Sequence, residues 1–120
     1  MESVTTYKDL ILWQKAMKLV KLTYLLIRKL PKEETYALSD QMRRAAISIP
    51  SNIAEGNGRK SKTEYIRFLD ISRGSLFELE TQLNIGVMLE FFNDNDVKEI
   101  FGLITEVNKM INSLITKLGK

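Results

Sequence analysis

Apolar residues recur with the period of an α-helix along most of this 120-residue chain. Between about residues 8 and 29 they cover one half of a helical wheel, and basic residues cover the other. The same periodicity spans about 36–55, 61–91 and 94–118, and no stretch alternates as a half-buried strand does. The pattern predicts an all-α fold, an antiparallel up-down-up-down four-helix bundle that forms a single domain over 1–120.

Short breaks separate the four predicted helices. Pro31 ends the first helix, because a proline ring clashes with the preceding turn. The glycines of "GNG" at 56–58 are able to take the left-handed backbone conformation that ends the second helix. Ser61 and Glu64 have the spacing of a capping box that opens the third helix. "NDND" at 93–96 predicts a turn and a cap before the fourth helix.

Two of the predicted helices carry more apolar surface than one bundle core needs. On the first helix, Leu22 and Leu25 fall inside the arc of lysines. On the third helix, further apolar residues spread around the side opposite its core face: Ile66, Ile71, Phe77, Ile85, Met88 and Leu89. A helix that is apolar on two sides is usually covered on two sides, although singly exposed apolar residues are common. The pattern therefore predicts self-association.

The residue types that are absent exclude several kinds of chemistry. The chain has no cysteine and no histidine, so it lacks disulfides, thiolate sites, histidine ligands for a metal and a histidine base. The carboxylates of Glu55, Glu64, Asp70 and Glu78 would have to act without such partners, and their wheel angles do not converge. We therefore predict that the protein is not an enzyme and has no metal or cofactor.

The distribution of charge adds two expectations. The start "MESVTTYKDL" lacks the apolar core of a signal peptide, and basic residues interrupt the apolar stretch 10–30 too often for a membrane span. This predicts a cytoplasmic protein without membrane contact. The net charge is +3; residues 1–60 carry a net +5 and residues 61–120 a net −2. A mild basic bias permits nucleic-acid binding without establishing it.

The stretch "RRAAISIPSNIAEGNGRK" at 43–60 combines a helical pattern with a proline and two glycines. Pro50 removes a backbone donor, which predicts a kink or local loosening of the second helix. A wheel places a continuous polar face opposite the core stripe and a side strip with small members between them; the side strip comprises Arg43, Ile47, Pro50 and Ala54. The residues alone leave two interpretations open, a helix with its turn or a binding site.

Two runs, "DLILWQKAMKLV" and "YALSDQMRRAAISIPSNIAEGNGRKSKTEYIRFLDISRGSLFELETQL", resemble the 23S ribosomal-RNA intervening-sequence proteins, also called four-helix-bundle proteins. The resemblance covers nearly the whole chain. Its most specific part is "Q-x-RRAA-x-SIPSNIAEG", followed by the arginine at 59, "FL" at 68–69 and "GS-x-x-E" at 74–78. The positions that match this pattern are Arg43, Arg44, Ser48, Pro50, Asn52, Glu55, Gly56, Arg59, Gly74, Ser75 and Glu78.

The resemblance implies a bundle that assembles into a ring-like homopentamer. Members of this family are encoded within insertions in bacterial large-subunit rRNA genes and also elsewhere, and RNA or other nucleic-acid binding is inferred for them. Whether the matching residues bind a ligand or build the oligomer stays open. Glu55 and Glu78 are each expected to pair with an arginine such as Arg44 or Arg73. For Arg43, an ion pair inside an interface and a ligand contact are both open.

We therefore predict a homo-oligomer that binds RNA or DNA through basic surface, with six candidate phosphate contacts: Lys15, Lys18, Lys21, Arg44, Arg59 and Lys60. Arginine suits this role because its planar fork holds a phosphate with two bonds. No helix-turn-helix, RRM aromatic pair or zinc finger is present to read bases. The alternative is a structural or adaptor ring that recruits a protein partner, such as a retroelement accessory factor. A continuous basic patch favours the first function, and interspersed acidic residues favour the second.

Overall fold

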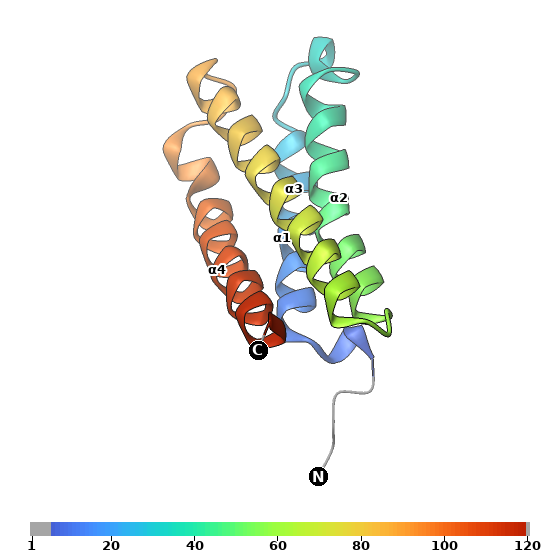
Figure 1. Ribbon diagram of the computed structural model, residues 1–120. Coiled ribbons are helices and arrows are strands. Elements are labelled where there is room, and N and C mark those ends of the chain that lie inside the picture. Colours follow the sequence, from blue (N-terminus) through green and yellow to red (C-terminus); the bar gives the residue numbers. More distant parts are fainter. Residues whose placement is uncertain (1–5, 120) are drawn as a thin grey trace.

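A computed structural model describes residues 6–119 of the chain. Its elements, in chain order, are the 3-10 helix η1 (Tyr7–Asp9), α1 (Ile11–Ile27), the 3-10 helix η2 (Lys32–Glu34), α2 (Leu38–Asn57), α3 (Lys62–Met88) and α4 (Asp94–Gly119). Each long helix packs against its neighbours in sequence, and α1 also packs against α4 (Figure 1). This arrangement confirms the predicted antiparallel four-helix bundle.

The first long helix begins three residues later than the sequence pattern predicts. Thr6 caps the short η1: its hydroxyl oxygen accepts from the Lys8 N–H at 3.1 Å, and the Asp9 carboxylate accepts from the Thr6 N–H at 3.3 Å. Leu10 is then extended (φ −74°, ψ 125°), so α1 starts at Ile11. A reciprocal cap has therefore formed a separate turn where the apolar periodicity predicts continuous helix.

The turn between α2 and α3 is built differently from the prediction. None of the glycines in the described residues has a positive φ, and Gly58 lies at φ −81°. Gly56 matters because of packing: a Cβ there would lie 2.9 Å from the Phe68 Cβ and 2.9 Å from the Tyr65 Cδ1. Its missing side chain lets α2 and α3 approach closely. Ser61 caps α3 as expected, since its Oγ accepts from the Glu64 N–H at 3.1 Å.

The third helix ends at Met88 rather than near residue 91. Glu90 takes a positive φ of 65°, and the Phe91 N–H donates to the Gly86 carbonyl at 2.8 Å. The chain then folds Phe92 back onto Gly86, where an added Cβ would lie 2.4 Å from the ring. This left-handed residue closes the helix in a way that apolar spacing does not encode.

A reciprocal cap at the start of α4 confirms the prediction made from "NDND". The Asn93 N–H donates to the Asp96 carboxylate at 2.9 Å, and the Asp96 N–H donates to the Asn93 side-chain oxygen at 2.8 Å. Lys29, just after α1, also donates to Asp96 at 2.7 Å. The Lys29 ammonium first and the Asn93 N–H second lower the pKa of Asp96 below its ordinary 3.8. One carboxylate thus joins the end of α1 to the start of α4.

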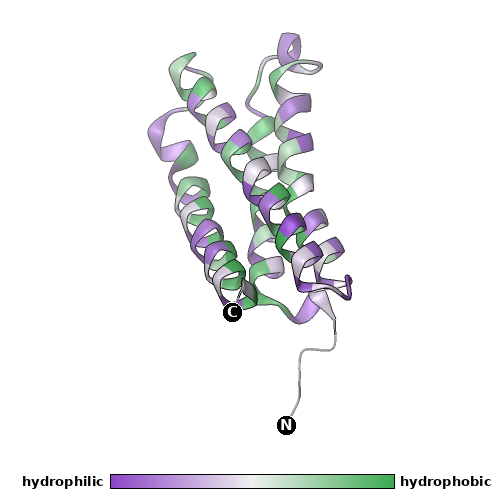
Figure 2. Cartoon of the chain, in the orientation of Figure 1, coloured by the Kyte–Doolittle hydropathy of each residue, from purple (hydrophilic) through white to green (hydrophobic). Residues whose placement is uncertain are grey.

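The core lies along the bundle axis, where the hydrophobic sides of the helices face one another (Figure 2). All four long helices contribute fully buried side chains, including Leu19, Met42, Ile49, Leu76 and Ile104. The buried hydroxyls of Thr23, Ser72 and Ser75 are paired within this core. The Ser72 hydroxyl, for example, donates from α3 to the Ile49 carbonyl of α2 at 2.8 Å. Such a bond removes the cost of burying a polar group and links the two helices.

The additional apolar residues on α1 and α3 lie largely at the surface of the single chain. On α3, Ile71, Phe77, Met88 and Leu89 are exposed, and on α1 Leu25 is exposed. Ile66, Ile85 and Leu22 are half-buried. The second apolar face is therefore real as a surface feature. Self-association through it stays a prediction.

Candidate nucleic-acid interface

Ser48 in the middle of α2 contacts α3, and Asn52 bonds to Ser48 within α2. The Ser48 and Ser75 hydroxyl oxygens lie 2.7 Å apart, and the Asn52 amide donates to the Ser48 carbonyl at 2.8 Å and to the Ser48 Oγ at 2.9 Å. The predicted polar face is therefore half-buried at Ser48 and Asn52, while its other members are exposed: Gln41, Arg44, Ser51 and Glu55. Because Ser48 Oγ accepts from Asn52, its own proton is available to Ser75. These three family-motif residues contribute to the contact between α2 and α3.

Pro50 is buried, and α2 continues as one helix on both sides of it. The loosening predicted at this residue therefore does not interrupt the helix. The side strip that contains Pro50 faces α1, where Ile47, Pro50 and Ala54 line a shallow groove of about 320 Å³ together with Trp13 and Met17. Pro50 thus packs within the bundle beside α1, whereas Ile47 of the same strip is exposed.

The predicted phosphate contacts do not form one patch. Lys15 and Lys18 lie on the side of α1 that faces α4, with their ammonium groups 2.9 Å from Glu106 and 3.4 Å from Glu99. Acidic residues are therefore interspersed with basic ones along this face. Lys21 forms no ion pair within residues 6–119. An ion-paired lysine remains available to phosphate only by giving up its carboxylate, which makes it a weaker candidate.

The arginines of the motif have partners other than those expected. Glu55 pairs with an arginine as expected, but this arginine is Arg59, at 3.0 Å. Arg44 pairs with Asp40 at 3.3 Å.

Arg73 pairs with Asp70 at 2.8 Å and donates to the Asn112 side-chain oxygen at 2.6 Å, which ties α3 to α4. Glu78 has no cation within ion-pair distance in the described part of the chain. The expected Glu78–arginine pair within one chain is therefore wrong. The reason is geometric: Arg73 turns toward α4, and no other arginine among residues 6–119 lies within ion-pair distance of Glu78.

Cationic side chains do gather at one end of the bundle, around the turn between α2 and α3. The guanidinium carbons of Arg59 and Arg67 lie 5.0 Å and 5.5 Å from the centre of the Phe68 ring. Lys60 and Lys62 are exposed on either side of the Ser61 cap. We call these four cations, Arg59, Lys60, Lys62 and Arg67, the basic end.

The basic end is more open to an anion than the side of α1 that carries Lys15 and Lys18. Of its four cations only Arg59 has a carboxylate partner among the described residues. It also surrounds the first turn of a 27-residue helix. The N–H groups and the dipole of a helix N-terminus favour negative charge. The arrangement is therefore suited to hold phosphates, and it offers no groups arranged to read base edges.

Sequence reasoning included Arg59 and Lys60 but missed Lys62 and Arg67. The signal is present in "GRKSK", which places Arg59, Lys60 and Lys62 close together in the turn. Lys62 belongs to the next helix, and only the fold shows that it adjoins the end of α2. Arg67 was missed because its role depends on the position of Phe68 relative to Arg59.

The fold and its basic end define an all-α protein of the four-helix-bundle class. A family model described as 23S rRNA-intervening sequence protein matches residues 8–113. The chain belongs to this family, which confirms the resemblance seen in the sequence. No curated protein matches it.

A solved crystal structure shows the same fold. It is that of a protein with unknown function from the S23 ribosomal protein family of Bacteroides thetaiotaomicron, with a TM-score of 0.81 and 25% sequence identity. The similarity covers 88% of this chain and 98% of that one.

Two further observations concern the described residues. None of their helices combines the length and the apolar character needed to cross a membrane. Residues 6–119 also contain no group of three acidic side chains placed to hold a metal ion.

Proposed function

We propose that this protein is a non-enzymatic, cytoplasmic homo-oligomer that binds nucleic acid, chiefly RNA, through backbone phosphates. The observation that carries the proposal is the basic end, where Lys60, Lys62 and Arg67 have no carboxylate partner among the described residues and surround a helix N-terminus. Its residues suit phosphate contacts because a guanidinium fork and exposed ammonium groups both bind phosphate oxygens. The family description supports RNA as the nucleic acid.

Phe68 adds a feature that favours single strands. Its ring is half-buried, and the guanidinium groups of Arg59 and Arg67 lie near it. Arginine planes and aromatic rings both stack on unpaired bases, and such stacking tolerates any base. The proposal is therefore binding without a fixed sequence, in which loops and single strands are preferred to duplexes.

Oligomerisation is the second part of the proposal. One chain carries a net charge of +3, which gives weak binding by itself. Several copies in a ring would present several basic ends to one RNA and raise the affinity through avidity. The exposed apolar residues of α3 are available for such an assembly: Phe77 is 48% exposed, Leu89 51% and Met88 70%. A pentamer is the size that we propose from the family resemblance.

Fluorescence anisotropy with labelled RNA tests the nucleic-acid part. The wild-type protein is titrated into single-stranded RNA, a duplex RNA and a DNA strand of unrelated sequence over a salt series. We expect binding to all of them, tightest to single-stranded RNA, with an affinity that falls steeply as salt rises. Absence of binding to every probe at low salt would reject the proposal.

The second candidate is an adaptor that recruits a protein partner. It is favoured by one observation, the acidic residues that alternate with Lys15 and Lys18 along the α1–α4 face. On this view the lysines keep the protein in solution and the apolar residues serve interfaces. Failure of the RNA titration, together with a stable assembly, would favour the adaptor.

A further inference from the structure

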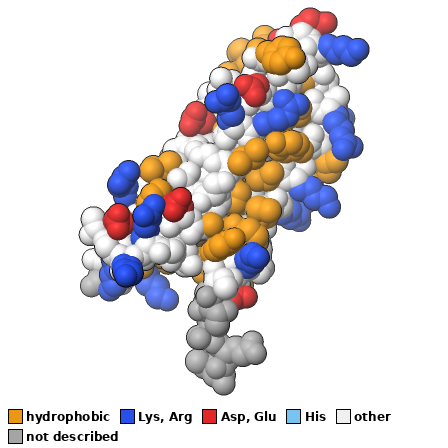
Figure 3. Space-filling model, turned by 90° about the vertical axis from the view of Figure 1, so that its right-hand side faces the viewer, with side chains coloured by type: hydrophobic (Ala, Val, Ile, Leu, Met, Phe, Trp, Pro, Cys, Tyr) orange, Lys and Arg blue, Asp and Glu red, His pale blue; other side chains and the backbone are white. Residues whose placement is uncertain are grey.

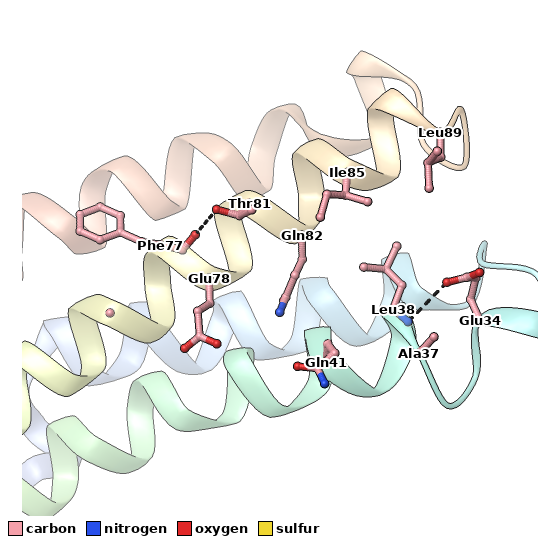
Figure 4. A pocket seen from close by; sticks show the side chains of 11 residues that line it. Glu34, Ala37, Leu38, Gln41, Phe77, Glu78, Thr81, Gln82, Ile85 and Leu89 are labelled. Atoms are coloured by element: carbon pink, nitrogen blue, oxygen red, sulfur yellow. Dashed lines mark hydrogen bonds between the residues drawn. The ribbon is translucent and has the colours of Figure 1, made fainter.

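A groove between α2 and α3 has an apolar floor and an acidic character. Its volume is about 700 Å³, and Leu38, Phe77, Ile85 and Leu89 supply apolar lining (Figure 4). Its charged lining residues are Glu34 and Glu78, and no cation of the described residues lines it. Such a groove fits an occupant that is apolar and carries positive charge.

One carboxylate in this groove lacks a cationic partner. The Glu78 carboxylate has no cation within ion-pair distance among residues 6–119. An occupant that brings a positive charge to this carboxylate would complement it. Figure 4 shows the Glu78 side chain pointing from α3 toward α2.

A complementary surface lies on another side of the same chain. Met17 and Tyr24 of α1 and Ile47 of α2 are exposed. The guanidinium carbon of Arg43 lies 5.9 Å from the centre of the Tyr24 ring, and Arg43 forms no ion pair in the described residues. We call these four residues the Arg43 strip. Figure 3 shows apolar side chains gathered in a band along this face, with Lys and Arg side chains beside it.

We propose that the Arg43 strip of one copy docks into the α2–α3 groove of the next copy. This inference rests on the self-association in the proposed function and names its two surfaces. Arg43 pairs with Glu78 of the neighbouring copy, while Tyr24 and Ile47 cover the apolar floor. The occupant is a second copy because this chain carries both halves of the match, an unpaired arginine on an apolar strip and an unpaired carboxylate in an apolar groove.

The difference between the two surfaces determines the symmetry of the assembly. The strip and the groove differ, so each contact is head-to-tail rather than two-fold symmetric. The strip lies along α1 and α2 and the groove lies between α2 and α3. Because the two surfaces are on different sides of the chain, successive copies are rotated relative to one another, and the assembly is a ring where that rotation closes.

Charge reversal tests the contact. Arg43→Glu places a carboxylate against Glu78 of the next copy, and Glu78→Arg places an arginine against Arg43. We expect each variant alone to need about tenfold or more protein for assembly, because like charges then face each other. An equimolar mixture of the two variants should assemble more readily than either variant alone, since a strip of one variant meets a groove of opposite charge on the other. In a five-membered ring one contact still joins two copies of the same variant, so the recovery should be partial. The double variant in one chain should also assemble.

The measurement is mass by analytical ultracentrifugation over a concentration series, with circular dichroism to confirm that each variant folds. Arg44→Glu is the control, because Arg44 lies outside both surfaces and pairs with Asp40. The neutral variants Arg43→Ala and Glu78→Gln replace any reversal that does not fold, and each should weaken assembly to a smaller extent.

Three results would overturn the inference. They are assembly unchanged in both reversals, a mixture that stays as dissociated as its components, and an effect of Arg44→Glu as large as that of Arg43→Glu. In each of these cases the mass of the wild-type protein tests self-association independently of the proposed contact. RNA titration at low salt reports the basic end separately, because neither substitution touches it. A wild-type mass of 13.8 kDa at every concentration would overturn both the docking and the assembly part of the proposed function.

Discussion

Replacement of Gly56 by alanine should destabilise the protein although alanine is the better helix former. An added Cβ would lie 2.9 Å from the Phe68 Cβ and 3.2 Å from the Tyr65 carbonyl oxygen. The second atom is backbone and the first is fixed to it, so side-chain rotation cannot relieve the contact, and α3 must move. Overpacking of this kind costs about 1–3 kcal/mol. The gain in helix propensity offsets less than about 1 kcal/mol of it.

The expected net loss is therefore about 1–2 kcal/mol, which lowers the melting temperature of a chain of this length by about 4–8 °C. Gly102→Ala is the matched control, because Gly102 lies within α4 and nothing lies within 4 Å of its added Cβ. It should raise the melting temperature by about 2–4 °C. Both are measured by circular dichroism at one protein concentration, since assembly makes melting concentration-dependent. A rise in both variants would refute the close-packing argument.

Two other substitutions test single contacts. Asp96→Asn should lower the melting temperature at about pH 7, and the difference from wild type should shrink below about pH 4. The reason is that the pKa of Asp96 is lowered in the folded protein. Such a carboxylate stabilises the fold above its ordinary pKa and loses that contribution as acid protonates it. Asp94→Asn is the control, and a difference that does not change with pH would contradict this role. Ser72→Ala should cost about 0.5–1.5 kcal/mol because it removes the buried hydroxyl bond to Ile49. Urea denaturation measures it, and an equal loss in Ser51→Ala, whose hydroxyl is exposed, would contradict the assignment.

The architecture could be predicted from the sequence because each helix carries a continuous apolar stripe. The helix ends at Ile11 and Met88 could not, since they depend on the cap at Thr6 and on the positive φ of Glu90. The sequence predicts Gly56 as a turn residue, because glycine can take a left-handed conformation. In the structure Gly56 lies within α2 and is needed because Phe68 of α3 packs closely against it.

The candidate site was predictable only in part for a related reason. The number of basic residues is visible in the sequence, but their partners are not. Lys15 and Lys18 acquire glutamates from α4, near the opposite end of the chain. Lys62 and Arg67 become part of a basic surface because the turn places them beside Arg59. Periodicity gives the face of one helix, and only packing shows which charges on two helices meet.

The central claim is that the basic end contacts phosphate, and two variants with the same reduction in charge test it. The basic-end variant combines three substitutions in one chain: Lys60→Ala, Lys62→Ala and Arg67→Ala. The α1 variant combines three others: Lys15→Ala, Lys18→Ala and Lys21→Ala. The measurement is the slope of log affinity against log salt for a single-stranded RNA. The basic-end variant should flatten the slope by up to about 0.7 for each phosphate interaction that it removes, or roughly 2 in total, and the α1 variant by much less. An unchanged slope in a folded basic-end variant, or an equal flattening in the α1 variant, would contradict the account.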